Sequence, residues 1–299
     1  MKKTAIVTGG TKDQFPAMAV LALNIADICP NIADELVIYH DGIPLEEQKK
    51  MQAIFPTKFI LYKSPFLDEK DFGGVVTNYF SLMVFCKYEC WNLLHDYKTV
   101  IWTDYDIVIT KDISEVSEKT NNYAKFVKAA NIAKKLYPQI YEKKVISNED
   151  IHKDGISCPL FYLNDSFPNY DEFYKNCIDL TSEIPDALYL PEEAIISILF
   201  LKNAIKYECL DEIMYVSQPR LNNATEKTKI LHAAGQPKFW SGLDNEQWNN
   251  YYNEWLMKYK GTPFCAKNKK RIIFKKIFKA FLPYGVIDLI RILKRKHQC

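Results

Sequence analysis

The sequence predicts an α/β protein whose β-sheet is covered by helices on both faces. Short apolar segments at 4–7, 35–40 and 58–62 have strand character, and helical segments at 15–28 and 45–54 separate them. This alternation is typical of parallel strands joined by helices. Sheets of this kind bind their ligands at the carboxyl ends of the strands. We therefore expect the functional residues of this chain in the loops that follow its strands.

The remainder of the chain continues the pattern less regularly. Residues 115–150 are polar, and we expect only helix and loop there. The other predicted elements are a helix at 78–94, a strand at 99–102, a strand at 156–163, a helix that starts at Pro191 and a strand at 230–232. Proline is favoured in the first turn of a helix, which supports the helix start at Pro191.

The composition is that of an ordinary folded protein. Of the 299 residues, 48% are apolar and 25% are charged, which argues against a disordered or fibrous chain. The eight cysteines include no Cys-x-x-Cys pair, so we expect buried thiols in a reducing compartment rather than a zinc site or a disulfide framework. The first residues carry no secretory apolar core. These features together predict a cytoplasmic protein.

The positive charge of the chain is concentrated at its carboxyl end. Residues 267–299 hold eleven Lys and Arg and a single acid, Asp288, although the whole chain has a net charge of +2. Phe274, Phe278 and other apolar residues recur there at helical spacing among lysines. This pattern favours a helix on an anionic membrane surface over an arm that binds nucleic acid. The alternative is a helix docked on the acidic body of the protein.

Two acidic residues interrupt an apolar stretch in the middle of the chain. Asp104 and Asp106 follow the strand at 99–102, and apolar residues resume at 107–109. Buried carboxylates are costly unless they are paired or bind a cation. Their oxygens suit Mg²⁺ or Mn²⁺, and such an ion neutralises a pyrophosphate leaving group. The pair predicts a metal site; the alternative is a turn in which Asp104 caps a helix and Asp106 is solvated.

A second motif follows the strand at 230–232. His232 is a borderline ligand that can complete a Mn²⁺ shell, Gly235 lets the backbone approach a phosphate, and Lys238 supplies a positive charge. A histidine at a strand end is also a common packing residue. The presence of the two aspartates upstream makes the metal interpretation the stronger one.

Together the two motifs resemble glycosyltransferase family 8, whose members include glycogenin and bacterial lipooligosaccharide galactosyltransferases. The resemblance rests on the segment TDYDIVI and on His232, Gly235, Lys238 and Trp240 at the spacing of that family. It implies a GT-A fold, which is a Rossmann-like nucleotide-binding sheet with helices on both faces. It also implies a UDP-sugar donor and a transfer that retains the anomeric configuration.

The resemblance assigns roles to individual residues. The metal ligands that it implies, for Mn²⁺ or Mg²⁺, are Asp104, Asp106 and His232. The donor-binding residues that we expect are Thr8, Lys87, Asp104, Gly235 and Lys238. In this hypothesis the metal, Lys238 and Lys87 stabilise the departing UDP electrostatically.

The sequence departs from the family pattern at two places within the matched residues 4–242. Lys153-Asp154-Gly155 stands where the family has Asn-x-Gly, and Glu192-Glu193 stands where it has Asp-Gln. We expect Glu192 or Glu193 to stabilise oxocarbenium character at the anomeric carbon. The alternative is that one of them only starts a helix favourably at its positive end.

The functional hypothesis is an enzyme that moves a hexose from a UDP-sugar to a glycan or glycolipid acceptor. A bacterial surface polysaccharide or lipooligosaccharide fits a catalytic domain at 1–266 that a membrane-associating tail at 267–299 holds on the inner face of the cytoplasmic membrane. One alternative is a GT-A domain that binds sugar or a membrane partner without catalysis. Another is an aspartyl-phosphate phosphatase, because its motif also begins with two aspartates, but the second acidic pair of such enzymes is missing from the sequence.

Overall fold

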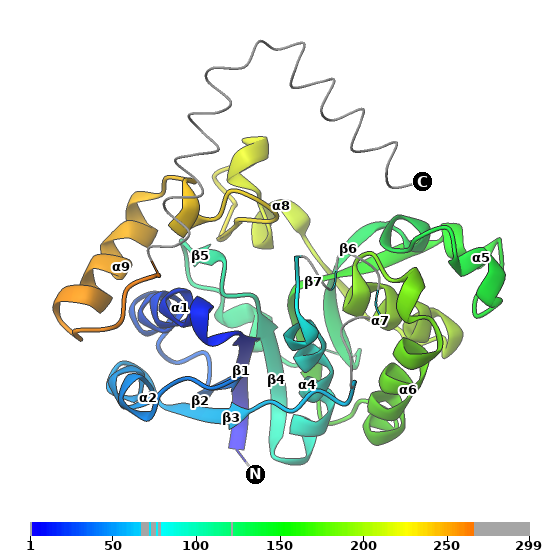
Figure 1. The fold of residues 1–299 in the computed structure, drawn as a ribbon, viewed down its shortest axis with the longest axis horizontal. Coiled ribbons are helices and arrows are strands. Elements are labelled where there is room, and N and C mark those ends of the chain that lie inside the picture. The colour runs from blue at the N-terminus through cyan, green and yellow to red at the C-terminus, as the bar shows by residue number, and fades with distance from the viewer. Residues whose placement is uncertain (1, 67–71, 73–75, 77–78, 121, 266–299) are drawn as a thin grey trace.

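The computed structural model describes residues 2–66, 72, 76, 79–120 and 122–265 (Figure 1). The predicted basic tail at 267–299 therefore lies outside the described residues. Within the part of the chain that is described, no helix has the length and hydrophobicity required to cross a bilayer.

The described strands form one large sheet and one small sheet. The strands of the large sheet are β1 (Lys2–Gly10), β2 (Glu35–His40), β3 (Thr57–Leu61), β4 (Tyr97–Thr103), β6 (Ala124–Asn131), β7 (Asp154–Asn164) and β8 (Glu208–Leu210). Their order across the sheet is β3-β2-β1-β4-β7-β6-β8. The predicted parallel pairing of the first three strands is confirmed. The sheet as a whole is mixed, because β7 runs antiparallel to both β4 and β6.

The neighbouring strands β1 and β4 mark the point where the chain changes direction across the sheet. The chain builds outward from β1 to β2 and β3, and it returns to add β4 on the other side of β1. Loops diverge at such a switch point and leave a crevice for a ligand. The glycines at the end of β1 allow a close approach there, since a Cβ atom on Gly10 would lie 2.8 Å from the ring of Tyr105.

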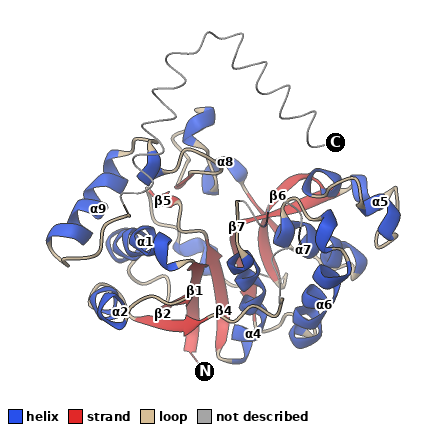
Figure 2. Ribbon diagram, in the orientation of Figure 1, coloured by secondary structure: helices blue, strands red, loops and turns tan. Residues whose placement is uncertain are grey.

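Helices cover both faces of the large sheet, as Figure 2 shows. They are α1 (Phe15–Ile28), α2 (Leu45–Gln52), α4 (Glu89–Asn92), α5 (Ile140–Lys143), α6 (Tyr170–Glu183), α7 (Pro191–Lys202), α8 (Glu212–Tyr215) and α9 (Glu246–Met257). Successive side chains of β1 point to opposite faces of the sheet, as in any pleated strand. Ile6 packs in one core with residues of α1 and α9, whereas Ala5 and Val7 belong to the core that α4, α6 and α7 complete.

The small sheet pairs β5 (Ile107–Ile109) with β9 (Ile230–His232) in antiparallel register. Ile107 lies opposite His232, and Ile109 lies opposite Ile230. This pairing brings His232, the first residue of the second motif, against Ile107, the residue that follows Asp106. The small sheet is therefore the element that joins the two predicted motifs.

Two predictions for the middle of the chain were wrong. The segment 115–150, expected to be helix and loop, contains β6, which pairs with β7 on one side and β8 on the other. The predicted helix at 78–94 is divided into a 3-10 helix at Leu82–Tyr88, the short α4 and a second 3-10 helix at Leu93–His95. Ser81 caps the first of these by accepting a hydrogen bond from the backbone N–H of Met83.

Candidate active site

A large cavity opens at the carboxyl ends of β1 and β4. Its volume is about 2030 Å³, and it is lined by the end of β1, the Asp104–Asp106 turn, the first turn of α7 and the segment that follows β9. Both predicted motifs contribute side chains to it. The cavity thus lies where the topology of the sheet leaves room for a ligand.

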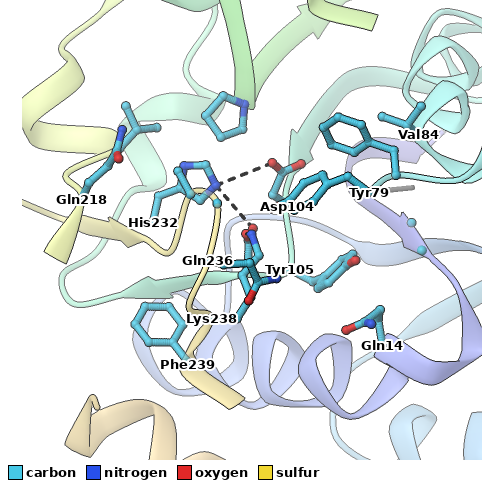
Figure 3. Close-up of a pocket in the computed structure, with 18 of the residues that line it drawn as sticks. Gln14, Tyr79, Val84, Asp104, Tyr105, Gln218, His232, Gln236, Lys238 and Phe239 are labelled. Carbon is cyan, nitrogen blue, oxygen red and sulfur yellow. Dashed lines mark hydrogen bonds and ion pairs between the residues drawn. The ribbon is translucent and has the colours of Figure 1, made fainter. Parts of the chain in front are cut away.

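Asp104, Asp106 and His232 converge at one point of this cavity. One ligand atom from each of the three lies within 4.8 Å of the others. The His232 Nε2 atom is 3.4 Å from Asp106 Oδ1 and 3.8 Å from Asp104 Oδ2. Figure 3 shows the His232 imidazole facing Asp104, while the ring of Tyr105, the next residue in the sequence, is directed away from the imidazole. We call these three residues the Asp-Asp-His cluster.

Backbone hydrogen bonds fix the Asp-Asp-His cluster in place. The Asp106 carbonyl accepts from Ala233 N at 2.9 Å, which continues the pairing of β5 with β9. The N–H of His232 donates to Ser217 O at 2.7 Å, and the N–H of Asp104 donates to Pro159 O at 2.8 Å. The three side chains are therefore held by strands on both sides of the cluster.

The second oxygen of each aspartate is anchored by another side chain. Asp106 Oδ2 forms an ion pair with Lys238, whose ammonium group also donates to Ala233 O at 2.9 Å. Asp104 Oδ1 accepts from Trp102 Nε1 at 2.9 Å and lies 3.1 Å from Lys87 Nζ. This arrangement leaves Oδ1 of Asp106 and Oδ2 of Asp104 directed at the imidazole.

The Asp-Asp-His cluster fits a divalent cation. Two carboxylate oxygens and an imidazole nitrogen form a donor set that suits Mn²⁺, and carboxylates also suit Mg²⁺. The anchors on the opposite oxygens orient the aspartates, as outer partners of metal ligands do. Burial alone would raise the pKa of Asp106, which is 6% exposed, but His232 and Lys238 outweigh burial and hold that pKa well below its usual range.

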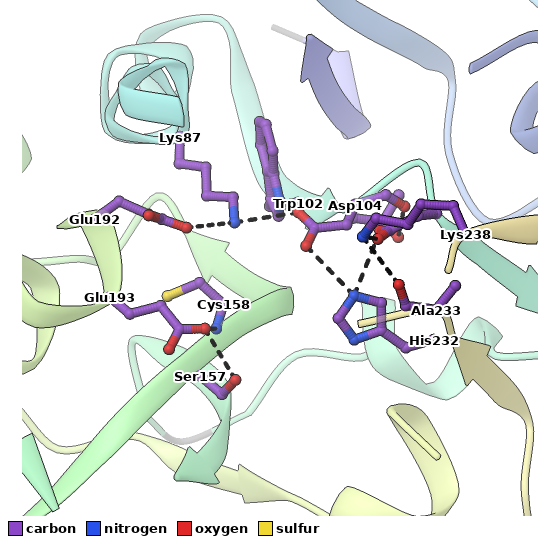
Figure 4. Close-up of polar contacts among 12 residues, drawn as sticks. Lys87, Trp102, Asp104, Ser157, Cys158, Glu192, Glu193, His232, Ala233 and Lys238 are labelled. Carbon is purple, nitrogen blue, oxygen red and sulfur yellow. Dashed lines mark hydrogen bonds and ion pairs between the residues drawn. The ribbon is translucent and has the colours of Figure 1, made fainter. Parts of the chain in front are cut away.

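Lys87 connects the Asp-Asp-His cluster to the start of α7. Its ammonium group lies 2.7 Å from Glu192 Oε1 and 3.1 Å from Asp104 Oδ1 (Figure 4). The side chain is buried, and its Nζ atom lies 5.4 Å from the centroid of the Trp102 ring. Burial lowers the pKa of Lys87, but Asp104 and Glu192 outweigh it and raise the pKa well above its usual value. Lys87 is therefore a fixed positive charge.

The two glutamates at the start of α7 both line the cavity, but their surroundings differ. Burial raises the pKa of Glu192 in spite of the nearby Lys87. Burial acts the same way on Glu193, but Lys135 and the backbone N–H of Cys158 outweigh it and lower the pKa of Glu193. Glu193 is the more strongly stabilised anion of the two. We call Lys87, Lys135, Glu192 and Glu193 the Lys-Glu pairs.

A family model described as glycosyl transferase family 8 matches residues 5–244. The chain belongs to this family. It is a glycosyltransferase by family and fold, which removes the phosphatase alternative. No curated protein sequence matches the chain significantly.

Solved structures of glycosyltransferases share the fold of this family 8 chain. Galactosyltransferase LgtC, in complex with donor and acceptor sugar analogs, has a TM-score of 0.63 at 13% identity, over 84% of this chain and 95% of that one. The bifunctional glycosyltransferase WbbM has a TM-score of 0.59 at 12% identity, over 90% and 52%. Glycosyltransferase GlyE of Streptococcus pneumoniae TIGR4 has a TM-score of 0.53 at 17% identity, over 88% and 65%. The predicted GT-A fold is confirmed.

Of two predicted donor-binding residues of the glycosyltransferase, Gly235 lines the cavity and Thr8 does not. Gly235 lines the cavity and has φ +69°, a left-handed conformation that favours glycine. Thr8 is 0% exposed, and in the described part of the chain its hydroxyl has no hydrogen-bond partner. The residues of that strand end that line the cavity are Gly9 and Gly10. The donor contacts of Thr8 and Gly235 remain predictions.

Sequence reasoning missed three residues that hold the acidic groups of this family 8 site. Trp102 anchors Asp104, Lys135 pairs with Glu193, and the Ser157 hydroxyl donates to Glu193 Oε1 at 3.0 Å. A signal existed for Trp102, because residues two apart on a strand point to the same face. Lys135 and Ser157 carry no such local signal, since their partner lies far along the chain.

Proposed function

We propose that this chain is a retaining, divalent-metal-dependent glycosyltransferase that moves a hexose from a UDP-sugar to a glycan or glycolipid acceptor. The observation that carries the proposal is the convergence of Asp104, Asp106 and His232 within one cavity, beside two lysines. A divalent cation held by oxygen and nitrogen ligands at a strand switch point would be suited to bind a nucleotide diphosphate. The similar galactosyltransferase LgtC was solved in complex with donor and acceptor sugar analogs, which supports a sugar donor as the ligand of this cavity.

The residues of the Asp-Asp-His cluster would hold Mn²⁺ or Mg²⁺. A bound divalent ion supplies charge neutralisation for the diphosphate that leaves. Lys238 keeps Asp106 oriented and places a positive charge at the cavity wall, where it attracts the same phosphates. Gly235 has no side chain, and the Arg220 guanidinium lies 3.1 Å from where its Cβ atom would be, so the approach of a phosphate to this backbone remains a prediction. These residues bind and orient the donor.

The Lys-Glu pairs act at the sugar end of the donor. Lys87 bridges Asp104 and Glu192, so the start of α7 is one ion-pair step from the Asp-Asp-His cluster. A sugar attached to the bound diphosphate would lie in the same cavity, which Glu192 and Glu193 also line. Carboxylates there stabilise positive charge that develops at the anomeric carbon.

The test of the proposed function is UDP release from a panel of UDP-sugars, with and without Mn²⁺, together with donor-induced thermal shift. We expect one or more UDP-sugars to raise the melting temperature and to be hydrolysed only with metal. Binding without any UDP release, also in the presence of glycan acceptors, would instead favour a sugar-binding module without catalysis. If no UDP-sugar binds and metal changes nothing, the assignment is wrong.

The basic tail at 267–299 is the membrane-associating part of this proposal, and 1–266 is the catalytic domain. Eleven positive charges interleaved with apolar residues favour binding to anionic lipid on the inner face of the cytoplasmic membrane. An acceptor in bacterial surface polysaccharide or lipooligosaccharide synthesis fits that location, and nucleic acid is not an expected partner. Truncation before Lys267 should abolish binding to anionic liposomes and preserve UDP-sugar hydrolysis. Liposome binding that survives truncation would contradict the role of the tail.

A further inference from the structure

A buried lysine behind the cavity pairs with the second glutamate of α7. Lys135 is the last residue of the 3-10 helix Ile132–Lys135, is 3% exposed, and forms an ion pair with Glu193. Glu193 belongs to the cavity lining, whereas Lys135 does not. Any influence of Lys135 on a ligand in the cavity therefore passes through the Glu193 carboxylate.

The two adjacent glutamates differ in how their oxygens are held. Glu193 Oε1 accepts from Ser157 Oγ at 3.0 Å and from Cys158 N at 2.9 Å, and Glu193 Oε2 faces Lys135. Glu192 Oε1 accepts from Lys87, but within the described residues Glu192 Oε2 accepts no hydrogen bond. Three donors on one carboxylate fix its position and favour its charged form. Glu193 is therefore the more rigidly placed anion.

Backbone hydrogen bonds and close contact with a glycine fix the position of Lys135. Its carbonyl accepts from both Tyr189 N and Leu190 N at 3.0 Å, directly before α7 begins. Its side chain passes over Gly155, where a Cβ atom would lie 2.8 Å from Lys135 Cε and 2.9 Å from Ala130 O. Lys135 thus ties together the start of α7, which carries Glu193, and β7, which carries the other donors to Glu193.

We propose that Lys135 is a positioning residue of the transfer reaction, which holds the Glu193 carboxylate ionised and fixed at the cavity wall beside the sugar of the donor. This inference rests on the proposed function, since it assigns the charge of Glu193 to the stabilisation of the anomeric centre. No covalent step is involved. The carboxylate stays ionised throughout, and its charge acts on the positive character that develops at carbon.

The proposal has a pH signature. The charged and titratable groups that face Glu193 are Lys135, Lys87, Glu192 and the thiol of Cys158. Burial favours the neutral form of Glu193, and the lysines outweigh it and lower the pKa. Glu193 is therefore ionised at neutral pH. Replacing Lys135 with Met leaves burial and the like charge of Glu192, so the pKa of Glu193 should rise and the active ionised form should appear only as the pH increases.

The test compares the parent with Lys135→Met, Lys135→Arg, Glu193→Gln and the double variant Lys135→Met/Glu193→Gln, all in the full chain. Metal-dependent UDP release is measured from about pH 5 to about pH 9, a range that includes the unperturbed His value and lies above the Glu value. For Lys135→Met we expect kcat to fall by about 10–100-fold at neutral pH, as for other outer partners of site residues. KM should change little, and kcat should rise with pH where that of the parent is flat. Lys135→Arg should recover most of the loss.

The double variant distinguishes positioning from simple charge compensation. It removes both members of the ion pair, so its melting temperature should return toward that of the parent if Lys135→Met alone is unstable. We expect its kcat to stay as low as that of Glu193→Gln, without the rise with pH. Lys143→Met is the matched control, since Lys143 pairs with Asp186 and neither residue lines the cavity. The control should retain the parent kcat.

Three outcomes would overturn the inference. Parent-like kcat and pH profile in Lys135→Met would do so, and so would full recovery of kcat in the double variant, which would make the pair purely structural. Both leave the proposed function intact, because the parent still releases UDP with metal. A parent that releases no UDP overturns the proposed function, and the role of Lys135 in transfer with it.

Discussion

The two ends of the cavity balance their charges differently. In the Lys-Glu pairs Lys135 faces Glu193, and Lys87 faces Glu192. In the Asp-Asp-His cluster the two aspartates have Lys238 and a share of Lys87, which also serves Glu192. The charge that remains uncompensated thus falls on the cluster that has an open oxygen on each aspartate. Buried charges are stable only when paired, so we infer that a cation completes the Asp-Asp-His cluster, whereas the Glu193 carboxylate has its partners within the protein.

The largest expected effect comes from removing the residue that the two ends share. Lys87→Met leaves the buried Glu192 and the half-buried Asp104 without their common partner. Breaking a buried pair in this way costs about 3–5 kcal/mol of unfolding free energy. Urea unfolding of the parent, of Lys87→Met and of the double variant Lys87→Met/Glu192→Gln checks this. The double variant should lose less unfolding free energy than Lys87→Met, because it no longer buries the unpaired Glu192 charge. A loss no greater than that of Lys143→Met would contradict the bridging role.

The next effect tests the Asp-Asp-His cluster alone. Asp106→Asn preserves the shape of the side chain, removes one negative ligand and leaves Lys238 without its ion pair. Metal-dependent UDP release should fall by about 10²–10³-fold, comparable to the loss of one strong electrostatic contact in other enzymes. Asp171→Asn is the control, since Asp171 is exposed and pairs with His95. Near-parent turnover in Asp106→Asn would remove the assignment of Asp106 as a ligand.

A smaller effect is expected from an anchor of the same cluster. Lys238→Met frees Asp106 Oδ2 and removes one positive charge from the cavity wall. We expect kcat/KM for UDP release to fall by about 10–100-fold. Lys238→Arg keeps the charge and should recover part of the loss. Equal kcat/KM in the parent and in Lys238→Met would show that this lysine neither contacts a phosphate of the donor nor orients Asp106 as a metal ligand.

The smallest effect concerns the backbone behind the Lys-Glu pairs. In Gly155→Ala the added methyl group meets the Ala130 carbonyl oxygen and the side chain of Lys135. We expect a loss of about 1–3 kcal/mol in unfolding free energy, as for other overpacked sites. The pH profile of UDP release should shift in the direction of that of Lys135→Met. Unchanged stability and an unchanged profile would mean that Lys135 does not depend on the space over Gly155.

The Asp-Asp-His cluster could be predicted from the sequence because its residues interrupt or end apolar strands. Asp104 and Asp106 divide two apolar segments, and His232 ends a short one. The pairing of β5 with β9, which brings them together, is a long-range contact and has no local signal. The family resemblance supplied that step.

Three of the four residues of the Lys-Glu pairs could be predicted from the sequence, and Lys135 could not. Glu192 and Glu193 stand out beside a proline at a helix start, and Lys87 matched the family. Lys135 lies in a segment whose β-strand was itself missed, because β6 has few large apolar residues and depends on β7 and β8 for its pairing. The ion pair between Lys135 and Glu193 forms only when the tertiary fold brings the two segments together. Neither segment therefore contains a sequence pattern that predicts it.

Binding of Mn²⁺ in the presence of UDP, followed by the paramagnetic resonance of the free ion, tests the metal site most directly. We expect one tight Mn²⁺ per parent chain and an affinity lower by at least about 10–100-fold in His232→Ala, where one of three converging ligands is lost. An affinity and a stoichiometry in His232→Ala equal to those of the parent would contradict the claim that Asp104, Asp106 and His232 hold a single cation.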